Sequence, residues 1–354
     1  MKRPLLFSTC CLLFTAAALL RSPAGATAGM EFPSLASEVL ATYEPEPGSA
    51  DGAARSAAGR AFLGALAAER RSLALMTLDD PERRLWSNLP TNGAAGGVRL
   101  ADCTREELQA LCDLLASCLS PEGYAMVRDI ALADDLLLRN GEPRRGFGVA
   151  EFWVAIFGNP DPEAAWGLQF DGHHLGLNLS LQGDEVNFSP SFLGAQPASF
   201  QRSGERVAPL EPVTAAAHGL LMLLSDEQRS RAIVGERRGD LQAGAGRDGF
   251  VPEREGLLLA DLNFDQRKQL KRLLEEILLP LPADARNARL ASLLATQATT
   301  HFSWRGPAAH PADVSFRLQG PKLIFEYACQ NLGGDPLQHL HAMHRDPTDE
   351  YGGN

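Results

Sequence analysis

The stretch Leu100-Ala-Asp-Cys-Thr-Arg-Glu-Glu-Leu-Gln-Ala-Leu111 returns later in the chain as Leu259-Ala-Asp-Leu-Asn-Phe-Asp-Gln-Arg-Lys-Gln-Leu270. A shorter copy begins at Leu224. Each copy carries a capping residue followed three positions later by Glu or Gln, the spacing of a capping box that closes the first turn of a helix. Apolar residues then recur at helical spacing, which predicts amphipathic helices with one face in a core. The pairs are Thr104 and Glu107, Ser225 and Gln228, and Asn263 and Gln266.

The repeat extends into strands. Phe170-Asp-Gly-His-His-Leu-Gly-Leu-Asn-Leu179 aligns with Leu318-Gln-Gly-Pro-Lys-Leu-Ile-Phe-Glu-Tyr327. We therefore predict two related halves, about 61–205 and 206–354, each with helices followed by antiparallel strands. Such halves pack as a single α+β domain, here 61–354, around a pseudo-two-fold axis. The alternative is a chance similarity among leucine-rich helices.

The amino terminus has the pattern of an export signal over residues 1–28. A basic start at Lys2 and Arg3 precedes an apolar stretch and a small-residue cleavage site. We expect an exported protein, periplasmic or extracellular, although a retained amino-terminal anchor is the alternative. Residues 29–60, rich in Ala, Pro, Glu, Gly and Ser, are expected to be a mobile lead-in.

The charge balance is acidic, with a formal net charge of −11. Nucleic acid and anionic membrane surfaces both require positive charge, so neither is expected as a partner, and a small-molecule substrate or ligand is. Removal of residues 1–28 leaves four cysteines, which lack the spacing of a metal finger. Free buried thiols and one bridge formed in an oxidising compartment both fit them. They are Cys103, Cys112, Cys118 and Cys329.

Histidines gather in two places. His173 and His174 are adjacent, and His339 and His341 lie close to the carboxyl terminus together with His344. Imidazole is the commonest metal ligand and titrates near neutral pH, so this clustering points to a metal or acid–base site. If the chain is extended at 339–341, both rings point to the same side, with their Cα atoms roughly 6.6 Å apart. A solvated polar tail is the alternative.

Strand alternation separates the first pair. His174 shares a small polar face with Asn178, whereas His173 falls on the apolar face as a hydrogen-bonded core or supporting residue. The repeat aligns His174 with Lys322 and Asn178 with Glu326. If the halves face one another, these four side chains converge.

These residues predict a divalent transition metal bound by three histidines and one carboxylate. Glu326, His174 and Lys322 are the candidate catalytic groups, and without metal Glu326 and a histidine would serve as base and acid. Four other residues are expected to support the site or contact substrate: His173, Asn178, Arg345 and Asp346. The ligands would be His174, Glu326, His339 and His341.

Two further patterns each allow more than one interpretation. Gly244-Ala-Gly-Arg-Asp-Gly249 matches a dinucleotide-binding string, but no strand precedes it and Pro252 follows, so we predict a loop. Arg83-Arg-Leu-Trp86 is either a ridge that contacts a ligand or a surface turn anchored by Trp86. The chain has no His-Glu-x-x-His helix and no Gly-x-Ser-x-Gly elbow.

Together these blocks resemble the domain-of-unknown-function family 3500 over nearly the whole chain after the signal. The family carries no settled activity, so the resemblance supports site residues and not a reaction, and His344 lies outside its pattern. The resemblance rests on Arg84-Leu-Trp86, Leu119 to Tyr124, Phe157 to Pro160, Trp166 to Leu175, Pro190 to Phe192, Gly194-Ala195, Pro197, Phe302-Ser-Trp304, Glu326-Tyr327, His339-Leu-His341, Arg345-Asp346 and Asp349 to Gly352.

The leading hypothesis is an exported metal-dependent enzyme, with hydrolysis ahead of oxidation. The alternatives are an exported binding protein for a metal or small ligand, without turnover, and a structural protein whose histidines make buried hydrogen bonds.

Overall fold

A computed structural model describes residues 32–45, 51–90, 96–139, 146–331 and 335–353. These residues belong to one contact unit that spans Phe32–Asn354. The predicted signal peptide, 1–28, lies outside the described residues. Within the described chain, no helix has both the length and the apolar character needed to cross a membrane.

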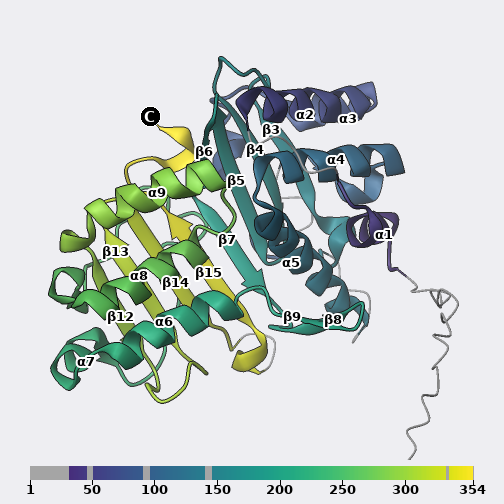
Figure 1. The fold of residues 1–354 in the computed structure, drawn as a ribbon. Helices are drawn as coiled ribbons and strands as arrows, with labels where there is room; N and C mark the ends of the chain where they lie inside the picture. The colour runs from purple at the N-terminus through teal and green to yellow at the C-terminus, as the bar shows by residue number, and fades with distance from the viewer. Residues whose placement is uncertain (1–31, 46–50, 91–95, 140–145, 332–334, 354) are drawn as a thin grey trace, which may run out of the picture. The chain divides into compact units, whose positions relative to one another are not determined.

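The centre of the fold is a thirteen-stranded sheet, counted over the described residues, which is mostly antiparallel (Figure 1). Its strands follow the order β1-β3-β4-β5-β7-β15-β14-β13-β12-β10, with β2 on β3, β6 on β5 and β11 on β12. The strands are β1 (Leu75–Met76), β2 (Val98–Arg99), β3 (Trp153–Phe157), β4 (Trp166–Gly172), β5 (Leu175–Gln182), β6 (Glu185–Asn187), β7 (Ser191–Ala195), β10 (Ile233–Gly235), β11 (Leu257–Leu258), β12 (His301–Arg305), β13 (Ser315–Gly320), β14 (Leu323–Cys329) and β15 (Leu340–Arg345). Strands β8 (Phe200–Arg202) and β9 (Glu205–Val207) form a separate hairpin.

Helices pack against the sheet, and with it they confirm the predicted α+β class. In Figure 1, α4 and α5 lie in front of the first set of strands and α6, α8 and α9 in front of the second. The helices are α1 (Leu35–Thr42), α2 (Gly52–Ala65), α3 (Ala68–Ala74), α4 (Arg105–Cys118), α5 (Pro121–Arg139), α6 (Glu211–Leu223), α7 (Asp226–Ala232), α8 (Phe264–Ile277) and α9 (Ala283–Ala295).

The three predicted helix starts are confirmed. Thr104, Ser225 and Asn263 each accept a hydrogen bond from the third residue of their helix, and the third side chain bonds back to the cap. Each capping box satisfies two backbone amides that the helix itself leaves without partners.

The two halves follow the same strand order. The path β1-β3-β4-β5 corresponds to β10-β12-β13-β14, and both outermost pairs, β1–β3 and β10–β12, are parallel. Each half has a hairpin with a two-residue turn, closed by the pair Gly172–Leu175 or Gly320–Leu323. This matches the aligned repeat; the duplication itself stays a prediction.

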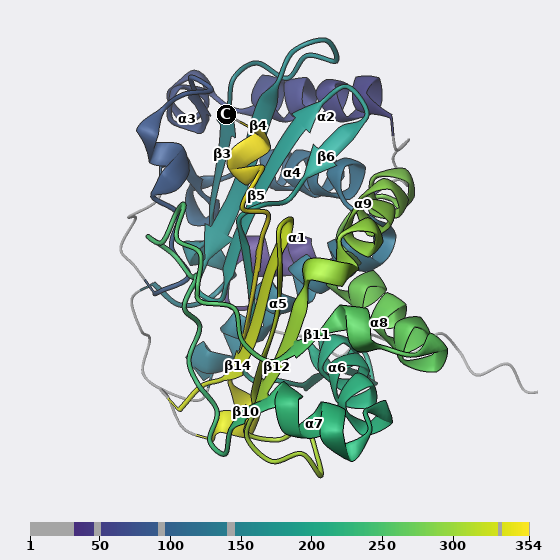
Figure 2. The ribbon, with the colours of Figure 1, turned by 90° about the vertical axis from the view of Figure 1, so that its left-hand side faces the viewer.

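Side chains alternate across β5 and β14 as predicted. One face of each strand lies in the main core, which contains Leu175, Leu177, Leu179 and Leu181 of β5 and Leu323, Phe325 and Tyr327 of β14. The opposite face is covered by irregular segments instead of helices. Figure 2 shows residues 236–256 running over the side of the sheet away from α6–α8. The predicted loop at 244–249 is part of this segment and is confirmed.

The amino-terminal part of the described chain is more ordered than predicted. The segment expected to be a mobile lead-in includes α1, whose Val39 and Leu40 are buried in the core, and the start of α2. Its apolar residues at helical spacing give it a face to bury.

All four described cysteines are buried free thiols.

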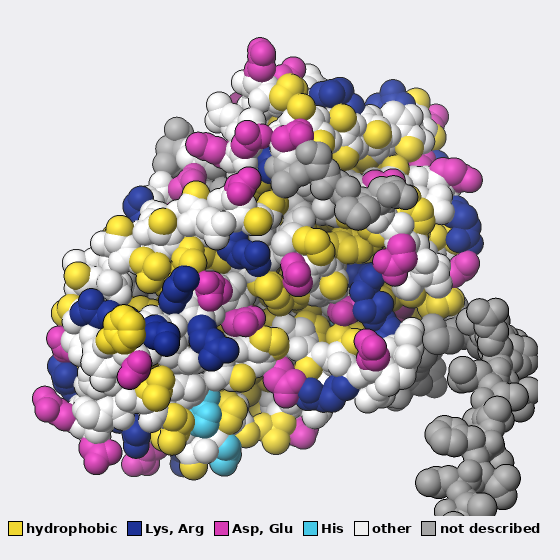
Figure 3. Space-filling view, viewed as in Figure 1, with side chains coloured by type: hydrophobic (Ala, Val, Ile, Leu, Met, Phe, Trp, Pro, Cys, Tyr) yellow, Lys and Arg dark blue, Asp and Glu magenta, His cyan; other side chains and the backbone are white. Residues whose placement is uncertain are grey.

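Acidic and basic side chains are interspersed over the helical face of the molecule. Figure 3 shows Lys and Arg beside Asp and Glu across the described part of this face.

Candidate metal centre

The turn between β4 and β5 presents His174. His173 and His174 are its two central residues, so neither lies in a strand as the alternation assumed. His174 has a left-handed backbone, with φ 67°, a region that histidine enters more readily than most residues. Its amide donates to the carbonyl of Asn88 at 3.3 Å, and its carbonyl accepts from Gly194 at 2.7 Å. The turn is therefore fixed from both sides, which aims the ring of His174.

The start of β15 and the residue before it supply the other two rings. His339 has extended backbone angles immediately before the strand, and His341 is its second residue, so both side chains lie on the same side as predicted. Nε2 of His339 is 2.8 Å from Nε2 of His174 and 2.9 Å from Nε2 of His341. One ligand atom from each ring lies within 4.8 Å of the other two.

Hydrogen bonds alone do not satisfy this arrangement. An unprotonated ring nitrogen presents one in-plane lone pair, and a protonated one presents one N–H. Nε2 of His339 therefore cannot donate to one neighbour and accept from the other at the same time. Two nitrogens bound to one ion at about 2.0–2.1 Å lie about 2.9 Å apart at a right angle and about 3.4 Å apart at the tetrahedral angle of zinc. The two separations match the right-angle value and are about 0.5 Å shorter than the tetrahedral one.

The electrostatics favour the neutral, ligating form of these rings. Burial lowers the pKa of His174 well below its usual value, and positive charge on His173, His341 or His339 would lower it further. Burial likewise lowers the pKa of His341 to about 3, with His339 as the next cause. Both rings are therefore uncharged at neutral pH, and their lone pairs are available to a metal.

His173 lies behind His174 and is held by an acid that the sequence interpretation missed. Nδ1 of His173 is 2.6 Å from Oδ1 of Asp134, and the ring centroids of His173 and His174 are 3.8 Å apart. Asp134 is buried on α5, where its other oxygen accepts from the amide of Gly148 at 2.6 Å. The expected supporting role of His173 fits this geometry. Asp134, His173 and His174 also form a second group of closely spaced ligand atoms.

Aromatic and small residues close the site. The Phe147 ring packs edge-on against His173 at 4.5 Å, and Phe192 packs against His341 at 4.8 Å. Gly194 leaves room for His174, since a Cβ there would lie 3.0 Å from its Cδ2. As a result His174 is only 2% exposed and His339 6%, whereas His341 is half-buried.

Glu326, the predicted carboxylate ligand, is placed elsewhere. Its Oε2 accepts from the amides of Gln242 and Ala243 at 2.8 Å each, and its Oε1 lies 3.3 Å from Arg317. It belongs to neither group of converging ligand atoms found among the described residues. The carboxylate therefore bonds the neighbouring strand β13 and the 242–243 loop instead of a metal. Of the four predicted ligands, three histidines remain.

Lys322 and Asn178 are also outside the histidine cluster. Lys322 is in the second hairpin turn and donates to Ser292 at 3.1 Å. Residue 328 is the strand partner of His341, so five residues of β14, about 17 Å, separate that position from Leu323. The expected convergence fails because β7 and β15 pair antiparallel at the centre, which places the two hairpins at opposite ends of the sheet. Asn178 bonds Gln169 and the carbonyl of Pro190.

The remaining carboxyl-terminal candidates organise the last turn of the chain. Arg345 bonds Glu350 and the carbonyl of Phe250, and Asp346 pairs with Arg289 at 2.5 Å. Arg345 is four residues along β15 from His341, about 13 Å, so it does not orient the histidine rings. His344 points to the other face, where it stacks on Phe188 at 4.0 Å.

The sequence held a signal for Asp134. It is one of two adjacent acids inside an otherwise apolar helical stretch, Ile130-Ala-Leu-Ala-Asp-Asp-Leu-Leu-Leu138. Buried carboxylates at such positions need a partner. Asp135, the second acid, accepts from the amide of Val149 at 2.9 Å.

Fold and site define an α+β protein with a buried cluster of three imidazoles at one end of a large, mostly antiparallel sheet. The chain belongs to the family described as protein of unknown function (DUF3500), whose family model matches residues 49–353. No curated protein and no solved structure matches the chain.

Proposed function

We propose that the protein is an exported metal-dependent enzyme whose divalent transition metal is held by His174, His339 and His341. The observation that carries the proposal is the convergence of three Nε2 atoms, two of whose separations are 2.8 and 2.9 Å. A metal held by three imidazoles keeps a position for water or substrate and supplies a Lewis acid there. We favour hydrolysis over oxidation, because a three-histidine set is typical of zinc sites that activate water.

The surrounding residues have positioning roles in this proposal. The Asp134 carboxylate fixes the tautomer and direction of the His173 ring, which packs on His174. His341, the most exposed of the three ligands, marks the side from which a small substrate would approach.

A specific observation favours a second candidate, a metal-binding protein without turnover. His174 and His339 are almost fully buried, and Phe192 packs against His341. A closed site of this kind suits retention of a metal more than exchange of a substrate. The amino-terminal export pattern, 1–28, supports an exported protein in either case.

The first experiment is elemental analysis of the full chain, purified without an affinity metal column. The comparison is with the double variant His339→Ala/His341→Ala, and with His310→Ala as a matched control because His310 is exposed. We expect about one equivalent of a transition metal in the wild type and the control, and a loss in the double variant.

The outcomes separate the candidates. If the protein takes up none of zinc, iron, copper or manganese, the metal proposal is overturned. If it binds one equivalent, the metal-loaded wild type is assayed with chromogenic ester, amide and phosphoester substrates. Turnover that disappears in the double variant supports the enzyme, and a loaded but inert protein supports the binding role.

A further inference from the structure

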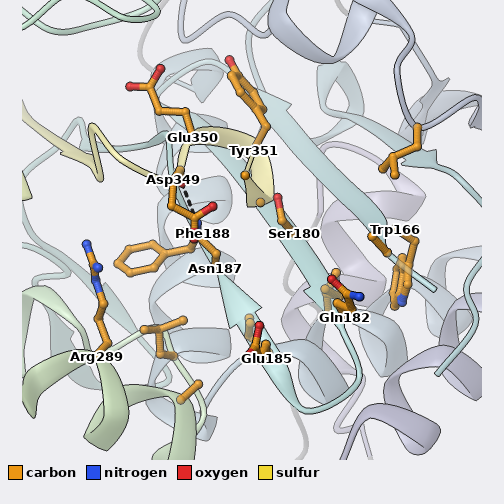
Figure 4. A pocket seen from close by; sticks show the side chains of 18 of the residues that line it. Trp166, Ser180, Gln182, Glu185, Asn187, Phe188, Arg289, Asp349, Glu350 and Tyr351 are labelled. Atoms are coloured by element: carbon orange, nitrogen blue, oxygen red, sulfur yellow. Dashed lines mark hydrogen bonds between the residues drawn. The ribbon is translucent and has the colours of Figure 1, made fainter. Parts of the chain in front are cut away.

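A cleft of about 1020 Å³ lies away from the histidines (Figure 4). The 78–84 segment, the end of β5, α9 and the carboxyl-terminal turn line it. Figure 4 shows Arg289 on one wall and Trp166 with Gln182 opposite, with Ser180 between them. Ser180 is six residues along β5 from His174, about 20 Å, so a small molecule in the cleft does not reach the metal centre.

Arg83 enters this cleft without an acidic partner. Among the described residues no carboxylate lies within ion-pair distance of it, and its donors reach only Ser180 Oγ at 2.8 Å and the Leu78 carbonyl at 3.5 Å. Aromatic rings flank the guanidinium, with the centroids of Phe157 and Tyr351 at 5.9 and 5.7 Å. Burial lowers the pKa of Arg83 to about 10, and the group that opposes this effect is the Tyr351 phenol and not a carboxylate, so a costly charge persists at pH 7.

Two more deeply buried arginines, and one on the far wall of the cleft, each have an acidic partner. Arg317 pairs with Glu255 at 3.0 Å and with Glu326, and Arg345 pairs with Glu350. Arg289, on the far wall of the same cleft, pairs with Asp346. A guanidinium has five N–H donors. The N–H groups of Arg83 that do not bond Ser180 or Leu78 are available to a ligand.

The space around Arg83 is built for its side chain. A Cβ on Gly167 would lie 2.9–3.1 Å from three atoms of the guanidinium group, so a larger residue there would displace Arg83 from this position. Gly352, with φ +83°, lets the carboxyl-terminal turn approach β5, since a Cβ would fall 2.5 Å from Cβ of Ser180. The cation and its neighbouring hydroxyl are therefore held in place before any ligand arrives.

We propose that the cleft binds a small organic molecule with one anionic end group, a carboxylate or phosphate, held by Arg83 and the Ser180 hydroxyl. In the rest of the lining seven carboxylates, among them Asp284 and Asp349, outnumber two further arginines. This lining disfavours polyanions and favours a body with neutral or positive polar groups. An amino acid or short peptide has this charge pattern. The inference is independent of the metal centre.

The test uses the full chain, stripped of metal by chelation, with three probes at constant ionic strength: acetate, inorganic phosphate and glycylglycine. Isothermal titration and thermal unfolding report binding. The variants are Arg83→Met and Arg83→Lys, and Arg206→Met is the control, because Arg206 forms an exposed pair with Glu211.

We expect saturable one-to-one binding of at least one probe to the wild type and the control, weakened tenfold or more in Arg83→Met. Arg83→Lys should be intermediate, because lysine keeps the charge but loses the planar fork. Without probe, Arg83→Met should unfold at the same temperature as the wild type or at a higher one. If Arg83 served to stabilise the fold, its replacement would lower the unfolding temperature. The proposal is overturned if no probe binds, or if Arg83→Met binds as tightly as the wild type. Should Arg83→Met fail to fold, Arg83→Lys and Gly167→Ala give the same test.

Discussion

Replacing Gly194 with alanine tests whether packing sets the geometry of the metal centre. Gly194 is the strand partner of His341, and a Cβ there would lie 3.0 Å from Cδ2 and 3.1 Å from Cβ of His174. Carbon atoms in contact prefer about 3.5–4.0 Å, so the ring would have to move by about 0.5 Å. The ring also packs against His173, whose centroid is 3.8 Å from its own, and this contact limits its movement.

The magnitude follows from how narrow metal–ligand distances are. A shift of about 0.5 Å exceeds the roughly ±0.2 Å that coordination bonds tolerate. We expect metal affinity to fall about 10- to 100-fold, which corresponds to about 1.4–2.8 kcal/mol. Overpacking should also lower the free energy of unfolding of the metal-free protein by about 1–3 kcal/mol.

The assay separates these two effects. Competition titration of zinc against a chromogenic chelator gives the affinity, and urea unfolding without metal gives the stability. Gly64→Ala is the matched control, since no atom lies within 4 Å of its added methyl group in α2. It should keep wild-type affinity and gain up to about 1 kcal/mol. If Gly194→Ala binds zinc as the wild type does, packing on His174 does not set the site and the reasoning is wrong.

Three further predictions concern residues outside the histidine cluster. Glu326→Gln should leave metal content unchanged but lower the free energy of unfolding in urea by about 1–3 kcal/mol, because Arg317 and the amides of residues 242 and 243 lose their charged acceptor; lost metal would restore Glu326 as a ligand. Burial raises the pKa of Asp171 to about 7, so the stability that this residue contributes is lost as pH rises from about 4 to 7, since the folded state holds a proton that the unfolded state releases. Buried histidines with lowered pKa values act in the opposite direction, so the difference between Asp171→Asn and the wild type is the readout: in urea titrations the stability of the variant should rise more steeply with pH, and equal slopes would contradict this. In a chain that begins at residue 29, the four described thiols should not react with a disulfide reagent at pH 8 until urea is added, because all four are buried and burial raises three of their pKa values; a fast-reacting thiol in that folded protein would refute it. Those three are Cys103 (about 12), Cys112 (about 11) and Cys118 (about 12).

Features set by neighbours in the sequence could be predicted. The capping boxes at Thr104, Ser225 and Asn263 depend on residues three apart, and the core faces of β5 and β14 follow from alternation. The shared direction of His339 and His341 is equally local, because two residues of an extended segment lie on one side.

Features set by distant pairing could not be predicted. Whether His174 meets Lys322 or His339 depends on how β7 pairs with β15, which no local pattern specifies. Asp134 reaches His173 only because α5 crosses the first hairpin.

One long-range contact follows from the sequence once the hairpin turn is recognised. Positions 317 and 326 are equidistant from the two-residue turn of the second hairpin, so a hairpin there makes Arg317 and Glu326 direct strand partners. In that register the carboxylate of Glu326 pairs with an arginine, which makes it a poor candidate for a metal ligand.

The same positions of the two halves carry different chemistry on a common frame. In the second half, Glu326 bonds Arg317 and the amides of residues 242 and 243, which ties down the 236–256 segment. In the first half the equivalent pair is the uncharged Gln169 and Asn178, and Gln169 bonds the carbonyl of Arg83 at 3.0 Å. Each pair therefore anchors the irregular segment above it. Because the first pair brings no carboxylate, the arginine it positions keeps donors for a ligand from outside the chain.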